Sequence, residues 1–221
     1  MGKNSFGTDV GIMIEEFVKA SLEQDVGRGD LYALVEPSVK ASARIIAKSD
    51  GVAAGIVYLN VLAQLEDFEI TWNVNDGESF LKGDVLANIS GTSHVLLKIE
   101  RTFLNILLHA SSIATLTKKY VSILEPYGVS LLDTRKTRPL LRIFEKYATR
   151  CGGAVNHRMG LDDSLMIKDT HLKTIENLNI YIKKARKKIP FTSKIEVEAE
   201  RFETAKEAFE AGADIVTVSY T

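Results

Sequence analysis

The sequence predicts an α/β protein with two parts, an N-terminal α/β sandwich-like domain followed by an incomplete (β/α) barrel lacking its last units. Short strand-like segments separated by DG, KGD and SG turns fill much of the first half, and strands alternate with helices in the second. One long helical pattern joins these halves. We therefore expect the domains to span residues 1–106 and 107–221.

Composition excludes several classes of protein. Lys and Arg number 28 against 29 Asp and Glu, so the net charge of −1 gives no support to nucleic-acid binding. No apolar run approaches the roughly 18 residues of a membrane span, and the N-terminus has no apolar signal core. A single cysteine, Cys151, cannot form an internal disulfide. These features predict a cytoplasmic protein that does not bind membranes.

In the first half, Glu15–Leu22 has the pattern of a short amphipathic helix, which the glycines of VGRGD end. ASARIIAKSDGVAAG predicts two strands around a DG turn, and FEITWNVNDGESFLKGDVLANISG predicts further short strands. In residues 97–124, apolar side chains recur at helical spacing until a proline and a glycine end the pattern.

In the second half, four strands alternate with three helices, which is typical of a parallel sheet or barrel. The predicted strands are VSLLDT (129–134), SLMIKD (164–169), KIEVEAE (194–200) and DIVTV (214–218). The predicted helices are PLLRIFEKYATR (139–150, with Pro139 near the first turn), NLNIYIKKARKKI (177–189) and FETAKEAFEAG (202–212).

Charged residues recur at the ends of these strands, where a barrel places its active face. They are Arg135, Lys136 and Arg138 after the first strand, His157 and Arg158 before the second, Lys168 and His171 after it, and Glu196 and Glu198 on one face of the third. Arg and Lys bind carboxylates and phosphates, and Mg²⁺ combines one or two carboxylates with phosphate oxygens. The residues alone predict an anion-binding barrel that uses a phosphorylated substrate and Mg²⁺.

Other charged and reactive residues are given structural interpretations. Arg142, Lys146 and Arg150 fall at i, i+4 and i+8 and predict an exposed helix face, with Glu145 as a partner. The run Lys183–Lys188 predicts a solvated helix end. We expect Cys151 to be a buried small residue and not a nucleophile.

The chain resembles quinolinate phosphoribosyltransferase, the carboxylating nicotinate-nucleotide pyrophosphorylase, over almost its whole length. The resemblance rests on DTRKT, GG-x-x-NHR-x-G and IKD-x-H in this order, with GRGD, ERT-x-LN and IEVEAE around them. It implies a sandwich-like domain followed by an incomplete barrel. It also implies a transferase (pentosyltransferase) reaction of NAD biosynthesis, in which quinolinate and phosphoribosyl pyrophosphate give nicotinate mononucleotide, pyrophosphate and CO₂.

The resemblance also implies roles for particular residues. Arg135, His157 and Arg158 would hold the quinolinate carboxylates, and Lys136 and Lys168 would contact phosphoribosyl pyrophosphate or the charge of the ring. Glu198 would lie near Mg²⁺ and the ribose, directly or indirectly, and Thr134 would position its loop. Arg101 would reach the active site of a neighbouring subunit, which implies a homodimer or a larger homo-oligomer. Lys136, Lys168 and Glu198 are the expected catalytic residues. Arg138 is a supporting candidate only.

One part of the sequence departs from the family pattern. After AGADI the chain reads VTVSYT, so Ser219 stands where the family has an aspartate that helps to bind metal and ribose, and the glycine-rich phosphate-binding loops do not follow. An alternative is therefore a truncated, catalytically inactive chain of this family. On that interpretation we expect at most trace turnover from residues 1–221.

Two further alternatives have less support. A related phosphoribosyltransferase-like protein of molybdate-transport operons shares similar barrel motifs, although DTRKT and NHR-x-G favour the quinolinate enzyme. DGESFLKGDVLANISG resembles the hairpins of lipoyl and biotinyl carrier domains, but it has no lysine at an exposed hairpin tip flanked by small residues or methionine. A shared pattern of turns explains that likeness.

Overall fold

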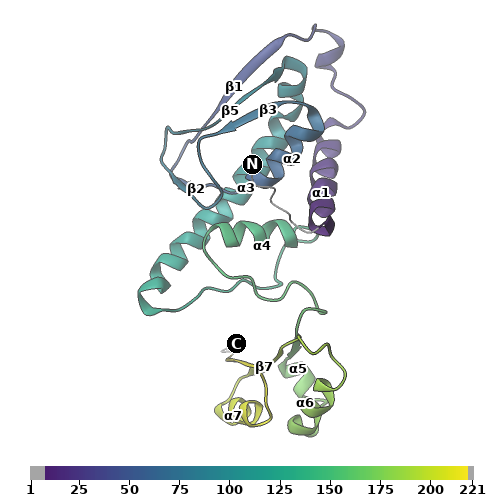
Figure 1. Ribbon diagram of the computed structural model, residues 1–221, viewed down its shortest axis with the longest axis vertical. Coiled ribbons are helices and arrows are strands. Elements are labelled where there is room, and N and C mark those ends of the chain that lie inside the picture. Colours follow the sequence, from purple (N-terminus) through teal and green to yellow (C-terminus); the bar gives the residue numbers. More distant parts are fainter. Residues whose placement is uncertain (1–7, 219–221) are drawn as a thin grey trace. The chain divides into compact units, whose positions relative to one another are not determined.

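In the computed structural model, residues 8–218 are described, and the chain divides into two compact units. The first unit contains the residues up to Asp133 together with Thr137–Asn156, and the second contains Thr134–Lys136 and the residues from His157 onward. Each unit has its own apolar core. Figure 1 shows their elements.

In its described residues, the first unit combines a small antiparallel sheet with four α-helices. Its elements are α1 (Thr8–Val26), a 3-10 turn (Tyr32–Leu34), β1 (Lys40–Ile46), β2 (Gly51–Val52), α2 (Ile56–Glu66), β3 (Glu69–Trp72), β4 (Ser79–Phe80), β5 (Val85–Thr92), α3 (Ser93–Leu124), a second 3-10 turn (Glu125–Tyr127) and α4 (Arg142–Cys151). The strand order is β1-β5-β3, all antiparallel, with β2 and β4 as a separate pair.

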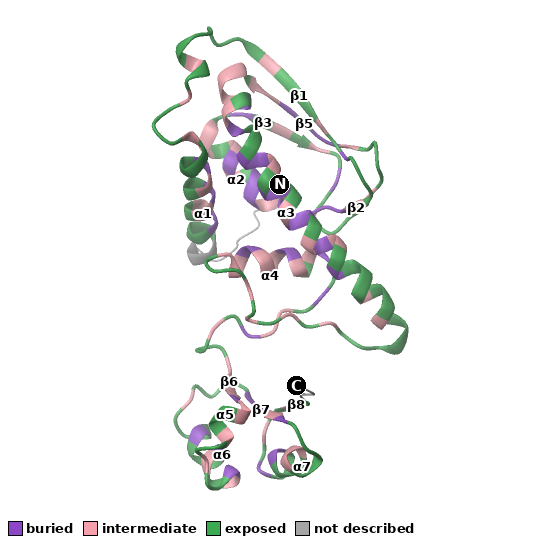
Figure 2. Ribbon diagram, turned by 180° about the vertical axis from the view of Figure 1, so that it is seen from behind, coloured by how far each residue is buried: buried purple, intermediate pink, exposed green. Residues whose placement is uncertain are grey.

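The core of this unit lies between the sheet and the helices, where Tyr58, Leu59, Ile99 and Phe103 are almost inaccessible to solvent (Figure 2). The predicted antiparallel strands are confirmed, but α2 was not predicted. Its sequence IVYLNVLAQLE is mostly apolar, so it lacks the alternation of polar and apolar positions that marks an amphipathic helix.

The long helix α3 begins four residues earlier than the predicted range of 97–124, at Ser93. The Thr92 hydroxyl accepts a hydrogen bond from the Val95 amide at 3.4 Å, and this N-cap explains the earlier start. Gly128 ends the following 3-10 turn in the left-handed conformation, with φ of 65°. The helix α3 continues through residues 106 and 107, where the domain boundary was placed. That boundary stays a prediction.

Two predictions around α4 are wrong. VSLLDT does not form a strand, because only an isolated parallel bridge pairs Leu132 with Val155. The helix predicted from Pro139 begins instead at Arg142. Leu140, with φ of 64°, adopts a left-handed conformation that a right-handed helix cannot contain.

The end of α4 packs closely on α3. A Cβ atom added to Gly152 would lie 2.4 Å from Thr117 Cβ and 2.6 Å from the Ala114 carbonyl oxygen, so no larger residue fits without moving a backbone. The first glycine of the CGG sequence thus permits close contact between the two helices.

The second unit is a three-stranded parallel sheet with helices between the strands, as predicted. Its elements are β6 (Leu165–Ile167), α5 (Asp169–Leu172), α6 (Leu178–Arg186), β7 (Ile195–Ala199), α7 (Phe202–Glu210) and β8 (Ile215–Val218), in the order β6-β7-β8. Ile167, Ile182, Ile195 and Val197 form the centre of its core. Within residues 8–218, the structure has no helix that is both long and apolar enough to cross a membrane.

Candidate functional site

The second unit brings together most of the residues predicted to bind substrate. Its sheet is parallel, so the ends of β6, β7 and β8 lie at one edge, and Lys168 and Glu198 lie at or near that edge. The segments Thr134–Lys136 and His157–Arg158 belong to the same compact unit. Arg101 is the exception, because it is exposed on α3 in the first unit.

Arg158 is the most buried cation of this set, with 8% of its surface exposed. Its guanidinium donates to the Ser164 carbonyl at 2.9 Å and approaches the Met166 sulfur at 3.4 Å. Burial lowers the pKa of Arg158, and the positive charge of Arg135 lowers this pKa further. Two guanidinium groups that repel each other at a partly buried site favour the binding of an anion.

His157 contacts a buried carboxylate, Glu196, which the sequence placed among the charged strand ends but to which it gave no binding role. Its Nε2 lies 2.8 Å from Oε2 of Glu196, which is only 2% exposed on β7. The distance is that of an ion pair, but Oε2 makes no well-aligned hydrogen bond to the described residues. The Thr217 hydroxyl on β8 donates to the other oxygen of Glu196. Glu196 therefore connects His157 to two adjacent strands.

Lys168 and Glu198 form a second, looser pair. Lys168 Nζ is 3.9 Å from Glu198 Oε2, which is longer than a hydrogen bond, so the Glu198 carboxylate keeps capacity to accept other partners. The Lys168 backbone amide donates to Nδ1 of His171 at 2.9 Å. His171 thus fixes the backbone at the end of β6.

The Thr134–Lys136 segment is held by a local turn. The Lys136 amide donates to the Thr134 hydroxyl at 3.0 Å, and both side chains are exposed. Thr134 therefore holds this local turn and leaves the Lys136 ammonium accessible. The substrate-binding roles of both residues stay predictions.

The prediction that Lys146 lies on an exposed helix face is wrong. Lys146 is 1% exposed, and its Nζ lies 2.5 Å from Oδ1 of Asp133. Phe144 and Ala148 are buried on the same helix. The spacing of the charged residues could not reveal this burial, because a lysine that is buried and paired occupies the same helical positions in the sequence as an exposed one.

Arg138 and Glu145 both lie in the first unit and pair with each other. Arg138 Nε donates to Glu145 Oε1 at 2.6 Å, and the same oxygen lies 3.5 Å from Nε2 of His109. Burial and the charge of Arg138 lower the pKa of His109. A cavity of about 740 Å³ next to these residues has none of the eight predicted substrate-binding residues in its lining.

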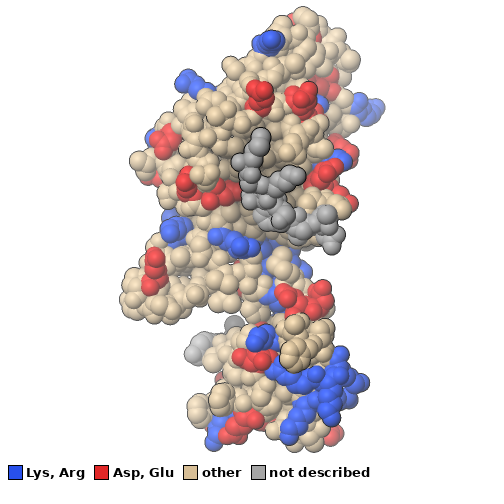
Figure 3. Space-filling model, viewed as in Figure 1, with Lys and Arg blue, Asp and Glu red and all other residues tan. Residues whose placement is uncertain are grey.

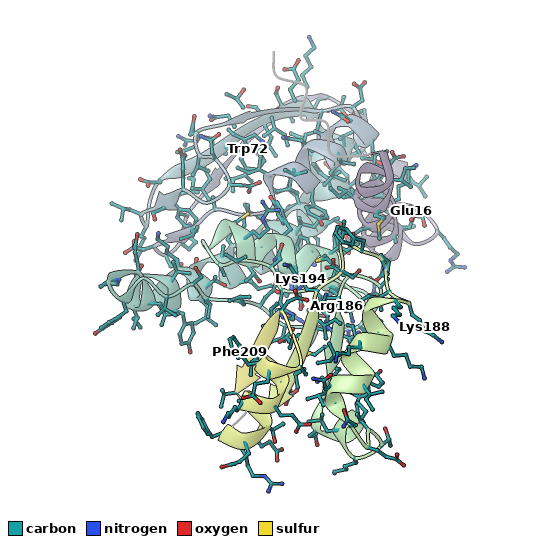
Figure 4. All side chains as sticks on the ribbon, turned by 60° about the horizontal axis from the view of Figure 1, so that its bottom comes forward. Glu16, Trp72, Arg186, Lys188, Lys194 and Phe209 are labelled. Carbon is teal, nitrogen blue, oxygen red and sulfur yellow. The ribbon has the colours of Figure 1, made fainter. Side chains whose placement is uncertain are left out.

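The run Lys183–Lys188 lies at the end of α6, where Lys and Arg side chains gather on the surface (Figure 3). Lys183, Lys184, Lys187 and Lys188 are exposed, as predicted. Arg186 is different, because it pairs with Asp214 and donates to the Gly212 carbonyl at 3.1 Å. Figure 4 labels Arg186 and Lys188. Arg186 therefore links the end of α6 to the start of β8.

The described residues contain no group of three or more His, Cys, Asp or Glu side chains placed to hold a metal ion. Glu198 borders a cavity of about 320 Å³ that Asp169, Glu200 and Arg201 also line. Because these carboxylates are not placed as a metal-binding group, Glu198 fits a Mg²⁺ ion that arrives with substrate phosphates better than a metal held by the protein alone. Ser219, predicted to replace a metal-binding aspartate, lies outside the described residues.

Comparison with known proteins gives consistent matches. Residues 30–111 match the model for the N-terminal domain of quinolinate phosphoribosyl transferase, and residues 113–219 match the model for its C-terminal domain. A probable nicotinate-nucleotide pyrophosphorylase [carboxylating] of Synechocystis is 36% identical over 208 residues, which are 93% of this chain and 70% of that protein. The probable Bacillus subtilis protein of the same name is 39% identical over 87% of this chain and 68% of its own length.

A solved structure is similar to the chain as well. The nicotinate-nucleotide pyrophosphorylase from Francisella tularensis matches with a TM-score of 0.90 and 31% sequence identity. The match covers 96% of this chain and 76% of that one.

Proposed function

This chain belongs to the quinolinate phosphoribosyltransferase family, and on that premise we propose that it joins quinolinate to phosphoribosyl pyrophosphate. The products are nicotinate mononucleotide, pyrophosphate and CO₂, in the biosynthesis of NAD. The ring nitrogen of quinolinate forms a bond to the anomeric carbon as the bond to pyrophosphate breaks. The 2-carboxylate then leaves as CO₂, and a proton takes its place.

The pair Arg135 and Arg158 is the observation that best supports this function. Quinolinate is a dianion, and binding one of its carboxylates offsets the burial and the repulsion from Arg135 that lower the pKa of Arg158. His157, held at 2.8 Å from Glu196, is a third group suited to a carboxylate. Lys136 is exposed and Lys168 partly exposed, which suits them to the phosphates of the second substrate.

Catalysis on this proposal is electrostatic. Negative charge grows on the departing pyrophosphate while positive charge grows on the ribose, and fixed charges that match both lower the barrier without a covalent intermediate. Lys136 and Lys168 would stabilise the leaving group, and Glu198 would lie near the ribose. Mg²⁺, held by Glu198 and phosphate oxygens, would supply further positive charge to the pyrophosphate.

We also propose that the active unit is a homodimer or a larger homo-oligomer. Arg101 is exposed on α3 and lies in a different unit from the other seven predicted binding residues. A second copy could bring Arg101 to them. A cytoplasmic location is part of the same proposal, and the single cysteine supports it.

Pyrophosphate release with quinolinate, phosphoribosyl pyrophosphate and Mg²⁺ tests the reaction, with calorimetric quinolinate binding measured beside it. The proposal expects both binding and release. Binding without release would support the inactive alternative, and the absence of both would overturn the assignment.

Mixing two inactive variants, Arg101→Ala and Lys168→Ala, tests the shared site. If Arg101 acts across a twofold interface, an equal mixture allowed to exchange subunits should recover about a quarter of the parent activity. This follows because half of the dimers are mixed and each mixed dimer has one intact site. No recovery despite exchange would show that Arg101 acts within its own chain or not at all.

A further inference from the structure

The chain passes from the first unit to the second at two places, after Asp133 and after Asn156. These two exits lie side by side within the first unit. Leu132 and Val155 form a parallel bridge, the Val155 amide donates to the Leu131 carbonyl at 2.8 Å, and the Asp133 amide donates to the Val155 carbonyl at 3.2 Å. Backbone hydrogen bonds therefore contribute to holding the two exits side by side.

Three side chains reinforce this arrangement. Lys146 Nζ lies 2.5 Å from Oδ1 of Asp133, and Asn156 Nδ2 donates to Oδ2 of Asp133 at 2.6 Å and to the Lys146 carbonyl at 3.0 Å. Each exit residue is thus bonded to the other and to α4. We refer to Lys146, Asp133 and Asn156 as the exit cluster.

The exit cluster is attached to a rigid part of the first unit. Lys146 lies between the buried Phe144 and Ala148 on α4, and Gly152 at the end of that helix contacts α3 without room for a side chain. A lysine that is 1% exposed is tolerated only when its charge is paired in good geometry, so its position is closely defined.

The residues that follow each exit are the predicted anion-binding residues. Thr134, Arg135 and Lys136 come directly after Asp133, and His157 and Arg158 come directly after Asn156. Two short cationic segments thus start from roots that are joined to each other and, through Lys146, to α4. Without the exit cluster, the backbone bridge would remain, but the two roots would lose their side-chain contacts with each other and with α4, and the direction of each segment would be less closely defined.

We propose that Lys146 is a positioning residue for quinolinate binding. Through Asp133 and Asn156, it fixes the direction in which the segments Thr134–Lys136 and His157–Arg158 begin, so that their cations meet one ligand with little loss of freedom. Lys146 does not touch the substrate on this proposal. The identity of the anion rests on the proposed function, whereas the ordering of the two segments does not.

If Lys146 only stabilises the fold, affinity should recover whenever stability does. A double variant therefore separates a positioning role from a purely structural one. Lys146→Met alone leaves Asp133 buried without its cation, so it should lower the melting temperature as well as the affinity. Lys146→Met combined with Asp133→Asn removes both charges, and the new amide oxygen can still accept from Asn156. This pair of changes should restore most of the melting temperature.

The measurements are quinolinate affinity by calorimetry, amide hydrogen exchange at residues 134–136 and 157–159, and the melting temperature. For the double variant we expect affinity to stay at least tenfold below that of the parent and exchange in both segments to be at least tenfold faster, with exchange in α3 unchanged. Lys146→Arg, which keeps the charge, should show a smaller loss of affinity and a smaller increase in exchange.

Lys98→Met with Glu66→Gln is the matched control, because this ion pair joins α3 to α2 within the same unit. It should alter neither affinity nor exchange in the two segments. Full recovery of affinity and exchange together with the melting temperature in the double variant would overturn the positioning role. If the parent itself fails to bind quinolinate, the proposed function fails, and hydrogen exchange still decides whether the exit cluster orders the segments.

Discussion

His157 Nε2 lies 2.8 Å from Oε2 of Glu196, and Glu196 also accepts a hydrogen bond from Thr217 on the neighbouring strand. Glu196 is 2% exposed, so this carboxylate is a fixed part of the sheet and not a mobile surface group. The position of a predicted substrate-binding imidazole is thereby tied to β7 and β8.

Glu196→Ala should weaken quinolinate binding about fivefold and lower the free energy of unfolding by about 1–3 kcal/mol, because two buried contacts are lost. Calorimetry and urea unfolding measure the two effects. Thr217→Val is the control, since it removes one hydrogen bond but keeps the carboxylate beside His157. It should leave the affinity within about twofold, and an equal loss in both variants would contradict a role for Glu196 in holding the ring.

Arg135→Ala should change affinity and stability in opposite directions. Quinolinate KM should rise more than tenfold, because a carboxylate loses a charge-assisted partner. The unliganded protein should be slightly more stable, by less than about 1 kcal/mol, because Arg135 lowers the pKa of Arg158 by repulsion. Steady-state kinetics and urea unfolding test this. An unchanged KM would show that Arg135 is only a loop residue.

Sequence patterns predicted the second unit well, because its strands and helices are short, alternate regularly and end in recognisable turns. Of the eight predicted substrate-binding residues, all except Arg101 lie in one compact unit. Their binding roles stay predictions.

The failures have physical causes. VSLLDT is as apolar as a strand, but among the described residues its strand-type pairing is limited to the isolated bridge between Leu132 and Val155. Glu196 and Glu198 look alike in sequence, and only the contacts with His157 and Lys168 distinguish them. Lys146 was misassigned because whether a lysine is buried depends on Asp133, thirteen residues away, and not on its own helix.

Stability between pH 7 and pH 5 should depend on His109. Its pKa in the folded chain is lowered from 6.5 by burial and by Arg138, so the unfolded chain takes up a proton first as the pH falls. The free energy of unfolding should therefore decrease below about pH 6.5, with a slope of at most about 1.4 kcal/mol per pH unit from this residue. Urea unfolding of His109→Gln should show a flatter profile; an unchanged profile would show that His109 does not contribute, and a steeper one would reverse the sign of this effect.

Cys151 should be slow to alkylate in the folded protein. Burial, together with the negative charge of Asp76, raises its thiol pKa to about 11, so at pH 8 only about one thiol in a thousand is ionised. In the unfolded chain, with a pKa near 8.5, roughly a quarter would be ionised. Mass spectrometry of iodoacetamide reactions should give a rate at least a hundredfold lower without urea than with it. A native rate within tenfold of the unfolded rate would show an accessible, reactive thiol.

Glu198→Gln should change the Mg²⁺ requirement of the reaction without changing the affinity for quinolinate. The change keeps the size of the side chain but removes the charge that a phosphate-bound Mg²⁺ would meet, while the contact with Lys168 at 3.9 Å is too long to fix the side chain by itself. We expect the Mg²⁺ concentration for half-maximal pyrophosphate release to rise at least tenfold, with quinolinate KM changed less than twofold. Glu210→Gln is the control, because Glu210 is an exposed residue on α7 whose partner is Lys206. A rise in quinolinate KM with no change in the Mg²⁺ requirement would place Glu198 beside quinolinate instead of beside the metal. A carboxylate that repels or orients this dianion would act without Mg²⁺.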